Sequence, residues 1–485
     1  MSAPRAIINV APKVGLEIMS RADLERIHTA TLAYLEQAGV RISSATALDL
    51  LGDAGAIVDH ATAMARISAD LVEKALAQAP AAIMLAGRAD VHDVTLDGEH
   101  CLLASGGPAE LVRDAESGQV RAATQADLIA ACTVVDDLPE LAVLGGPPVR
   151  ALDAPVAGRC LHELEVCFTH TTKHVHLAGP LAAHDAELVA DMALCLAGST
   201  SELRRRPPLS LCGAGAEALD AALVFAGRGL PVSVVAAAAG SDGALGGAAP
   251  DDLAAAVTLA NASVLAALTV VQLAAPGAPF FYAAHPGLFG WADSLRGARA
   301  NVFALAAAQL AHRYHVPLSA SVLATGADAP DWQAGTQGSF GALTGTLARA
   351  GLVVGAGLLG RRRIFSLQQL IMDSEIYSVA AKIAAGIVVD DDTIALETIE
   401  KVGIGGNYLS ERHTRAHMKE VWRPRLLDRT PWDSWVQGGR KGSYDKATEL
   451  LHSILESHQA ETPGAVQAAE LRHILEIADY GKEIR

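Results

Sequence analysis

The sequence predicts an α/β protein built on a closed barrel of eight parallel strands, each followed by a helix. Three observations support this fold class. Short apolar segments alternate with longer segments of helical periodicity from residue 102 onward, the short segments are apolar on both faces, and there are eight such pairs. With 485 residues, the chain is long enough for a (β/α)8 TIM barrel with additions at both ends.

Residues 1–101 are expected to form an appended helical and β region before the barrel. A first helix begins after Ser20, a residue type that caps helices, and ends at Gly39. The other predicted elements are two short helices, at residues 45–52 and 69–78, and short strands between residues 82 and 100 that are joined by a turn at Asp97 and Gly98.

The barrel itself is expected to occupy residues 102–386, and residues 387–485 are expected to form a largely helical C-terminal extension. The predicted barrel strands are residues 102–107, 141–148, 174–179, 209–215, 231–240, 279–285, 317–325 and 351–359. The predicted helices are residues 124–137, 156–169, 183–197, 216–228, 250–272, 291–314, 331–350 and 366–385. Strands that alternate with helices in this way form a parallel sheet.

An open, doubly wound sheet is the alternative to the closed barrel. Such a sheet usually has about six strands and carries a glycine-rich turn that binds a nucleotide. The segment GAGLLG at residues 355–360 is not a GxGxxG motif, and no acidic residue follows it at the distance expected of a ribose-binding carboxylate. The sequence therefore favours the barrel.

The charge and cysteine content exclude several classes of function. The formal net charge is -16, with 38 basic and 54 acidic residues, so nucleic acid is not an expected partner. The six cysteines are scattered without a CxxC pair, which is typical of buried thiols in a reducing compartment. The N-terminal residues lack the basic start and apolar core of a signal peptide.

One long apolar segment, residues 254–275, needs a separate interpretation because its length approaches that of a membrane span. Asn261, Ser263 and Gln272 interrupt it and Pro276 ends it, which favours a buried helix. We therefore expect a soluble, cytoplasmic protein that does not interact with membranes.

In a barrel of this kind, the reactive groups lie where strands end and helices begin. The residues that this rule selects are Arg150, His176, Glu217, Asp242, Tyr282, His285, Trp291, Thr325, Asp328, Asp331, Gln333 and the run Arg361, Arg362 and Arg363.

Several sequence motifs resemble those of one known family, in the same order and along almost the whole chain. The N-terminal motifs are LEQAGVRI, LDLLGDAGAIVD, RISADLVEKALAQAP and SGGPAELVRDAESGQVRAAT. The central motifs are AAPGAPFFY, DWQAG at residues 331–335 and SLQQLIMDSEI at residues 366–376, and the C-terminal motifs are IEKVGIGGNYLSERHT, RPRLLDR and WxxGGRKGSYDKA. Together they resemble the trimethylamine methyltransferase family.

The resemblance implies an enzyme that demethylates a methylated amine and passes the methyl group to the cob(I)alamin of a separate corrinoid protein, with no tightly bound cofactor of its own. Founding members of the family carry pyrrolysine in the barrel, whereas this chain contains only the standard twenty residues. It is therefore similar to the branch that acts on small quaternary amines such as glycine betaine.

Methyl transfer from a quaternary ammonium has modest chemical requirements. The nitrogen already carries a full positive charge, so a tertiary amine leaves without a proton donor. The enzyme holds and aligns the cation for in-line attack by an external nucleophile, and proximity supplies much of the acceleration. The lack of a GxSxG or HExxH motif in the sequence agrees with this chemistry.

Aromatic side chains hold quaternary ammonium groups through their ring faces. Phe281, Tyr282, His285, Phe289 and Trp291 cluster near the end of the sixth predicted strand, in a chain with few aromatic residues, so we expect substrate contacts there. The alternative is that Phe280 and Phe281 pack in the core and that Trp291 covers a helix end.

A second group of candidates lies beyond the seventh strand. Asp331 and Gln333 belong to the family-like DWQAG motif, and with His285 they are the predicted catalytic residues. The alternative for Asp331 is that it caps the following helix. Thr325 and Gln337 are predicted substrate contacts, and Gln337 stands where the family often has Glu, which removes a carboxylate counter-charge.

No metal site is predicted. Strand alternation places His174 and His176 on one face without a third ligand, so His176 is expected to line the barrel near its mouth and contact substrate. His413 and His417 lie one helical turn apart without an obvious carboxylate partner, which favours a surface or interface role. Arg361, in the run of three arginines, is predicted to bind a betaine carboxylate, with a solvated run of charge as the alternative.

The sequence is also compatible with two other functions. The first is a barrel lyase or hydrolase that transfers protons through His285 and Asp331. The second is a non-catalytic protein that binds quaternary amines. The Ala-rich helices and the C-terminal extension also favour a homo-oligomer.

Overall fold

A computed structural model describes residues 4–154, 156, 158–179, 181–235, 250–289, 297–418 and 422–483. Its centre is a sheet of eight strands, and every neighbouring pair in the sheet is parallel. In ring order, the strands are β6 (Leu102–Ser105), β9 (Leu141–Gly146), β10 (His174–Ala178), β11 (Leu209–Ala214), β12 (Val232–Val235), β13 (Tyr282–Ala284), β14 (Leu318–Ser321) and β15 (Leu352–Ala356).

Backbone hydrogen bonds between β12 and the residues just before β13 close the ring. The Val232 N–H donates to the Pro279 carbonyl at 2.9 Å, and the Phe281 N–H donates to the Val232 carbonyl at 3.0 Å. Since β15 also pairs with β6, the strands form a barrel, and the predicted fold class is confirmed. All eight predicted strand segments contain one of these strands, although residues 236–240 of the fifth segment lie outside the described residues.

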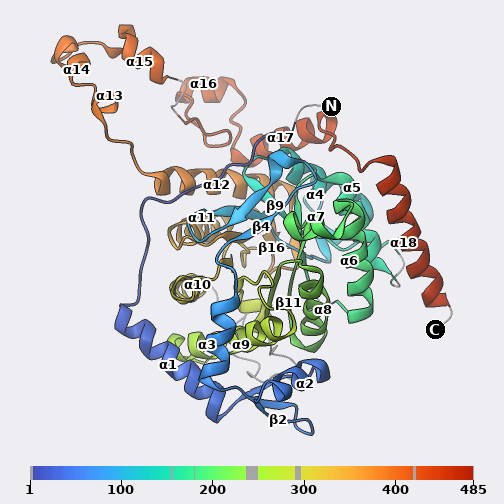
Figure 1. Cartoon of the computed structure of the whole chain (residues 1–485). Helices are drawn as coiled ribbons and strands as arrows, with labels where there is room; N and C mark the ends of the chain where they lie inside the picture. Colours follow the sequence, from blue (N-terminus) through green and yellow to red (C-terminus); the bar gives the residue numbers. More distant parts are fainter. Residues whose placement is uncertain are drawn as a thin grey trace.

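A helix follows each barrel strand and covers the outside of the barrel (Figure 1). These helices are α4 (Gln125–Asp137), α5 (Arg159–His170), α6 (Ala183–Ala197), α8 (Gly215–Arg228), α9 (Leu253–Ala274), α10 (Ala298–Arg313), α11 (Trp332–Leu347) and α12 (Leu367–Ala385). A short additional helix, α7 (Thr200–Arg205), follows α6. Thr124, Asp331 and Ser366 accept backbone hydrogen bonds at the N-termini of α4, α11 and α12, which fixes where those helices begin.

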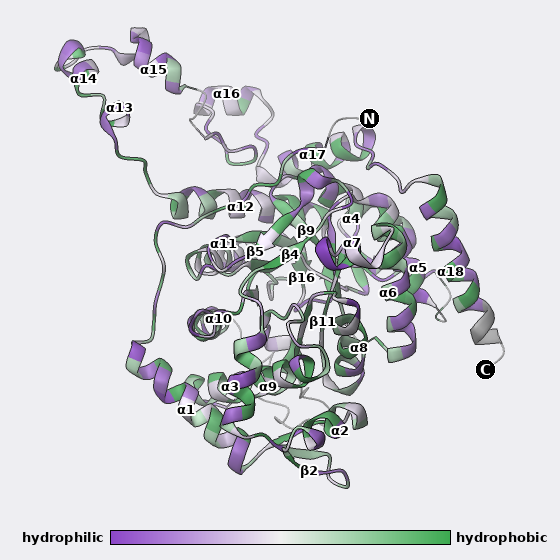
Figure 2. Ribbon diagram, in the orientation of Figure 1, coloured by the Kyte–Doolittle hydropathy of each residue, from purple (hydrophilic) through white to green (hydrophobic). Residues whose placement is uncertain are grey.

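Helix α9 is the long apolar segment, and its length and composition would allow a membrane span. In the structure it packs against α1 (Arg21–Gln37), α3 (Ala69–Gln78), α8 and α10, and most of its residues are buried. Its polar Asn261 is paired there, since its amide donates to Thr31 and Tyr314. The prediction of a buried helix is confirmed. Figure 2 shows hydrophobic residues concentrated on the barrel strands and on the helices around them.

The N-terminal region covers one side of the barrel and fills one of its ends. Besides α1 and α3 it contains α2 (Ala45–Asp53) and a small sheet of β1 (Val40–Arg41), β3 (Met64–Arg66) and β2 (Ile57–Asp59). The hairpin of β4 (Ile83–Leu85) and β5 (Val94–Leu96) packs against Leu102, Ala104, Phe281, Leu352 and Val354, and so fills the N-terminal end of the barrel.

One prediction for this hairpin was wrong. Residues 86–93, which include the 3-10 turn Asp90–His92, join β4 to β5, and the turn at Asp97 and Gly98 instead leads from β5 toward β6. Asp97 caps this second turn by accepting hydrogen bonds from the Glu99 and His100 N–H groups, both at 2.9 Å. Asp97 and Gly98 do form a turn, as their residue types indicate, but the two strands that pair with each other, β4 and β5, are joined by the longer segment 86–93.

At the opposite end of the barrel, β16 (Leu358–Leu359), β17 (Ile364–Phe365), β7 (Leu111–Arg113) and β8 (Val120–Ala122) form a small sheet. The C-terminal extension is helical, as predicted. Helices α17 (Ser443–Ser457) and α18 (Ala465–Glu483) pack on the barrel helices, whereas α13 (Asp391–Ile394), α14 (Leu396–Val402) and α15 (Arg412–His417) form an arm that projects away from the barrel, with α16 (Trp432–Gln437) near its base (Figure 1).

Candidate active site

The candidate active site is a cavity of about 820 Å³ at the C-terminal ends of β13, β14 and β15. Helices α10 and α11 form its sides, and the loops that follow the three strands form the rest of its wall. Its size lies within the usual range for small-molecule sites, and its position is the face where barrel enzymes carry their chemistry. Its lining includes Ser321, Thr325, Gln333, Gln337, Phe340 and Arg362.

Arg362 is one of two neighbouring arginines that line this cavity, with Arg361. Its guanidinium Nη1 donates to the Ser321 hydroxyl at 2.8 Å, and among the described residues it forms no ion pair with a carboxylate. Burial lowers its pKa, but a guanidinium stays charged near neutral pH. The described lining contains no acidic side chain, so the charge of Arg362 favours an anionic group of a bound ligand.

The loop that carries Arg362 has a strained backbone. Arg361 and Arg362 both adopt left-handed conformations, with φ of 56° and 73°. Such conformations cost a non-glycine residue about 1–2 kcal/mol each and concentrate at functional sites. The strain turns the chain so that the side chain of Arg362 reaches Ser321 at the end of β14.

Asp373 of α12 supports this loop from below, and sequence reasoning missed its role. Its carboxylate is fully buried, accepts the Gly357 N–H at 2.8 Å and accepts the Gln369 side-chain amide at 2.8 Å. Burial raises the pKa of Asp373 to about 7. The SLQQLIMDSEI motif, which the sequence showed only as a family-like pattern, therefore supplies the polar support for the loop after β15.

On the neighbouring strands β10 and β11, a hydroxyl joins two buried histidines. His174 Nδ1 faces the carbonyls of Ala86 and Pro207, at 3.3 and 3.1 Å, so this nitrogen carries the proton. Burial lowers the pKa of His174 to about 3, so the ring is neutral and its Nε2 accepts from the Ser210 hydroxyl at 2.8 Å. The Ser210 oxygen in turn accepts the Nδ1–H of His176 at 2.8 Å.

This chain of hydrogen bonds sets the tautomer of His176. Burial lowers its pKa to about 4, so a neutral ring whose Nδ1 donates must keep a lone pair on Nε2. That nitrogen is buried and has no hydrogen-bond partner among the described residues. His176 therefore presents an acceptor inside the barrel, but its side chain does not line the described wall of the mouth cavity.

His285 follows β13 and is fully buried close to both His176 and Arg362. Its Nε2 is 2.8 Å from the Ser319 hydroxyl, and its Nδ1 is 3.7 Å from the Cys212 sulfur. Burial, followed by the nearby positive charge of Arg362, holds its pKa well below the usual range for histidine. A neutral imidazole whose two ring nitrogens both have polar partners is a poor proton donor at neutral pH.

The predicted aromatic cage is not assembled by the described residues. Phe281 points into the barrel, where it packs with the plugging hairpin, and its ring lies 5.4 Å from that of His176. Tyr282 points out of the barrel and donates to Asn261 of α9 at 3.1 Å, because successive strand residues face opposite sides. Phe289 packs against Phe303 of α10, and Trp291 lies outside the described residues. Tyr282 therefore does not line the described cavity.

The DWQAG motif divides between structure and site. The Asp331 carboxylate caps α11 by accepting the Gln333 and Ala334 N–H groups at 2.9 and 3.1 Å, and it is exposed outside the cavity. Gln333 and Gln337 line the cavity, as does Thr325, and Gln337 also accepts the Gly326 N–H at 2.9 Å. Arg361 lines the cavity beside Arg362, so the structure brings together four of the predicted residues.

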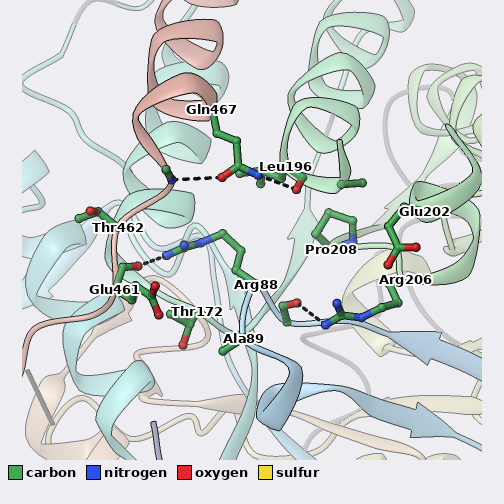
Figure 3. A pocket seen from close by; sticks show the side chains of 13 residues that line it. Arg88, Ala89, Thr172, Leu196, Glu202, Arg206, Pro208, Glu461, Thr462 and Gln467 are labelled. Carbon is green, nitrogen blue, oxygen red and sulfur yellow. Dashed lines mark hydrogen bonds between the residues drawn. The ribbon is translucent and has the colours of Figure 1, made fainter. Parts of the chain in front are cut away.

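A second cavity, of about 290 Å³, lies at the opposite, N-terminal end of the barrel (Figure 3). There the Arg88 guanidinium donates to the carbonyls of Thr171 and Glu461, and Arg206 pairs with Asp93 at 2.7 Å. These bonds attach the C-terminal extension and the β4–β5 hairpin to the barrel. Features at this face of a barrel usually serve stability, so we assign the cavity a structural role.

Comparisons with known proteins agree with this architecture. The chain matches the family model of trimethylamine methyltransferase over residues 3–476. It is 31% identical to trimethylamine methyltransferase MttB of Desulfitobacterium hafniense, strain DSM 10664 / DCB-2, over 95% of this chain and 94% of that protein. It is 27% identical to glycine betaine methyltransferase of Desulfitobacterium hafniense, strain Y51, over 87% of this chain and 88% of that protein.

A solved structure supports the fold at greater distance. The monomethylamine methyltransferase MtmB of Methanosarcina barkeri superposes with a TM-score of 0.50 at 12% identity, covering 92% of this chain and 90% of that one. The family match along nearly the whole chain, the 31% identity to a full-length relative and the eight-stranded barrel lead to one conclusion: this chain belongs to the trimethylamine methyltransferase family of enzymes.

Proposed function

We propose that this protein demethylates a small quaternary amine that also carries a carboxylate, a betaine, and passes the methyl group to the corrinoid of a separate protein. The observation that carries the proposal is the pairing of Arg362 with Ser321 in a cavity whose described lining has no acidic side chain. A guanidinium in such a site attracts a carboxylate and disfavours a substrate whose only charge is positive.

The cationic end of the substrate is placed on the α11 side of the cavity. Phe340 lines this side and is 60% exposed, so its ring is free to contact a trimethylammonium group. Gln333 and Gln337 offer neutral amide oxygens to the cation. A carboxylate at either position would instead compete with the substrate's carboxylate for Arg362. Arg362 at one end and Phe340 with the two amides at the other would orient a zwitterion.

The chain's own residues bind and orient the substrate and limit its contact with water, which is the contribution that proximity catalysis needs. The corrinoid partner supplies the nucleophile that accepts the methyl group. No protein proton has to move, because the departing tertiary amine is neutral. The neutral state of His285 and the capping role of Asp331 are consistent with a site that does no acid–base chemistry.

We place the corrinoid protein over the mouth of the barrel. Trp332 is 84% exposed at the start of α11 and lines a third cavity, of about 450 Å³, with Phe340, Leu426 and Leu427. Exposed aromatic residues at the rim of a site are typical of a surface that another protein covers.

Three further parts of the proposal concern the whole protein. The six free cysteines, five of them buried, favour a reducing, cytoplasmic location. The exposed apolar residues of the projecting arm favour a homo-oligomer. We also retain the division into residues 1–101, 102–386 and 387–485 as a proposal about domains.

The test is a methyl-transfer assay with the purified full chain and a reduced corrinoid protein. Glycine betaine, proline betaine and carnitine should each be compared with choline and trimethylamine, which lack a carboxylate. We expect methyl-cobalt absorbance with at least one betaine and none with choline or trimethylamine. Turnover of choline at the rate of the betaines would contradict the assignment of Arg362.

Two further measurements on the same samples, calorimetry and the pH dependence of turnover, separate the two remaining alternatives. Tight binding of a betaine without any methyl transfer would favour a protein that only binds quaternary amines. Turnover without corrinoid, with a bell-shaped dependence on pH, would favour the proton-transfer enzyme.

A further inference from the structure

The projecting arm has no hydrophobic core of its own. No residue from 385 to 418 is buried, although the arm contains three helices, of four, seven and six residues. Isolated helices of this length are unstable in water. Small units without a core usually depend on a disulfide, a metal ion or a partner, and the described part of the arm contains no cysteine.

Three side chains of metal-binding type converge within the arm. His413 and His417 lie one turn apart on α15, with ring centroids 4.3 Å apart. Asp392 of α13 faces both, with its carboxylate oxygens 3.8 Å from His413 Nε2 and 3.3 Å from His417 Nε2. One ligand atom from each residue can be chosen so that all lie within 4.8 Å of one another.

We propose that Asp392, His413 and His417 bind a divalent transition metal, with Zn²⁺ as the ion that the ligands fit best. Tetrahedral Zn²⁺ with bonds of about 2.0–2.1 Å separates its ligand atoms by roughly 3.3 Å, so small side-chain rotations complete the site. Two imidazoles and one carboxylate suit Zn²⁺, and a fourth position is left for water or another ligand.

The site joins parts of the arm that are distant in sequence. Asp392 and His413 are 21 residues apart, and the hydrogen bond from His413 Nε2 to the Asp392 carbonyl, at 2.8 Å, already brings them together. When the metal binds, His413 Nε2 releases its proton and its hydrogen bond to the Asp392 carbonyl, and coordinates the metal through its lone pair. The metal–ligand bonds then hold the two segments together. The sequence did not predict a metal site at the two histidines, because their carboxylate partner, Asp392, lies on α13 and is distant along the chain.

An ion pair without metal is the competing explanation for this cluster. The carboxylate of Asp392 is 74% exposed, and exposed pairs contribute about 0–1 kcal/mol, which is too little to order an arm without a core. The two explanations differ in their response to added metal.

The experiment uses the full chain, stripped with a chelator and titrated with Zn²⁺ and, separately, with Co²⁺. We expect one Zn²⁺ per chain with micromolar or tighter affinity, an intense visible Co²⁺ spectrum of tetrahedral type, and slower proteolysis within residues 387–418 when metal is bound. His413→Ala, His417→Ala and Asp392→Asn should each weaken binding at least tenfold.

A matched control is His452→Ala, because His452 forms an exposed pair with Glu116 at 2.7 Å and no third metal-binding side chain joins them among the described residues. This variant should bind metal as the wild type does. The arm variants remove no buried side chain, so circular dichroism should show unchanged folding. Absence of stoichiometric binding by the wild type, or binding by His417→Ala and Asp392→Asn that equals the wild type, overturns the proposal.

Discussion

The carboxylate of Asp373 accepts the Gly357 N–H at 2.8 Å and so ties the loop after β15 to α12. Four residues later this loop reaches Arg361 and Arg362, the strained pair whose second member enters the cavity. The position of the proposed carboxylate-binding group therefore depends on a buried acid that does not itself line the cavity.

Stability should fall with rising pH because of Asp373. Burial raises its pKa to about 7, above the value in the unfolded chain, so the folded protein binds the extra proton between about pH 4 and about pH 7. The free energy of unfolding should decrease across this range and level off above it. Urea unfolding near pH 5 and near pH 8 should show a smaller difference for Asp373→Asn than for the wild type.

Asp373→Ala serves as the companion variant. It leaves the Gly357 N–H without its acceptor, which should cost about 1–3 kcal/mol near pH 5, where Asp373 of the folded wild type is protonated. Asp373→Asn keeps an oxygen for that N–H and should cost less. An identical pH dependence in wild type and Asp373→Asn would show that this carboxyl titrates equally in the folded and unfolded chain.

Replacing Arg362 should impair betaine turnover. Arg362→Ala removes the proposed partner of the substrate carboxylate, and the loss of one member of a buried charge pair costs about 2 kcal/mol or more, or roughly thirtyfold in kcat/KM. Arg362→Lys keeps the positive charge but lacks the planar guanidinium group, so its kcat/KM should lie between those of the wild type and Arg362→Ala. The readout is methyl transfer to the corrinoid protein at several substrate concentrations.

Arg363→Ala is the control for Arg362, because Arg363 is exposed and is not part of the described cavity lining. Its kcat/KM should stay within about threefold of the wild type. Equal losses in Arg362→Ala and Arg363→Ala would mean that the run of arginines acts only through its general charge.

Asp331 should matter for stability more than for chemistry. Asp331→Ala removes the cap of α11 and should cost about 1 kcal/mol, whereas Asp331→Asn keeps the cap and should cost little. We expect kcat/KM of Asp331→Asn to stay within about threefold of the wild type across the pH range. A large loss of activity in Asp331→Asn, with normal stability, would instead indicate the proton-transfer mechanism.

Ser210 should be costly to replace because it serves two histidines. Ser210→Ala leaves His174 Nε2 and His176 Nδ1 without partners, and each buried unpaired group costs about 1–3 kcal/mol. Ser453→Ala, at an exposed position, is the control and should change the urea midpoint very little. A loss in Ser210→Ala no larger than in the control would argue against the assigned hydrogen-bond chain.

The order and type of the main elements could be predicted from the sequence because they depend on local patterns. Apolar runs alternating with helical periodicity predicted all eight barrel strands, and Ser20 marked the start of the first helix through a capping bond to the nearby Asp23. The position of Thr325, Gln333 and Gln337 at the cavity also followed, since residues after barrel strands lie at one end of the barrel.

Only the tertiary structure decided which side chains meet. Tyr282 and Phe281 are neighbours in the chain but face opposite sides of β13, and their register against α9 and the hairpin is not visible in a local pattern. Likewise Arg362 reaches Ser321 across 41 residues, and Asp392 reaches His413 and His417 through the fold of the arm. Sequence periodicity determines local conformation over a few residues, whereas a binding site depends on packing between segments that are distant along the chain.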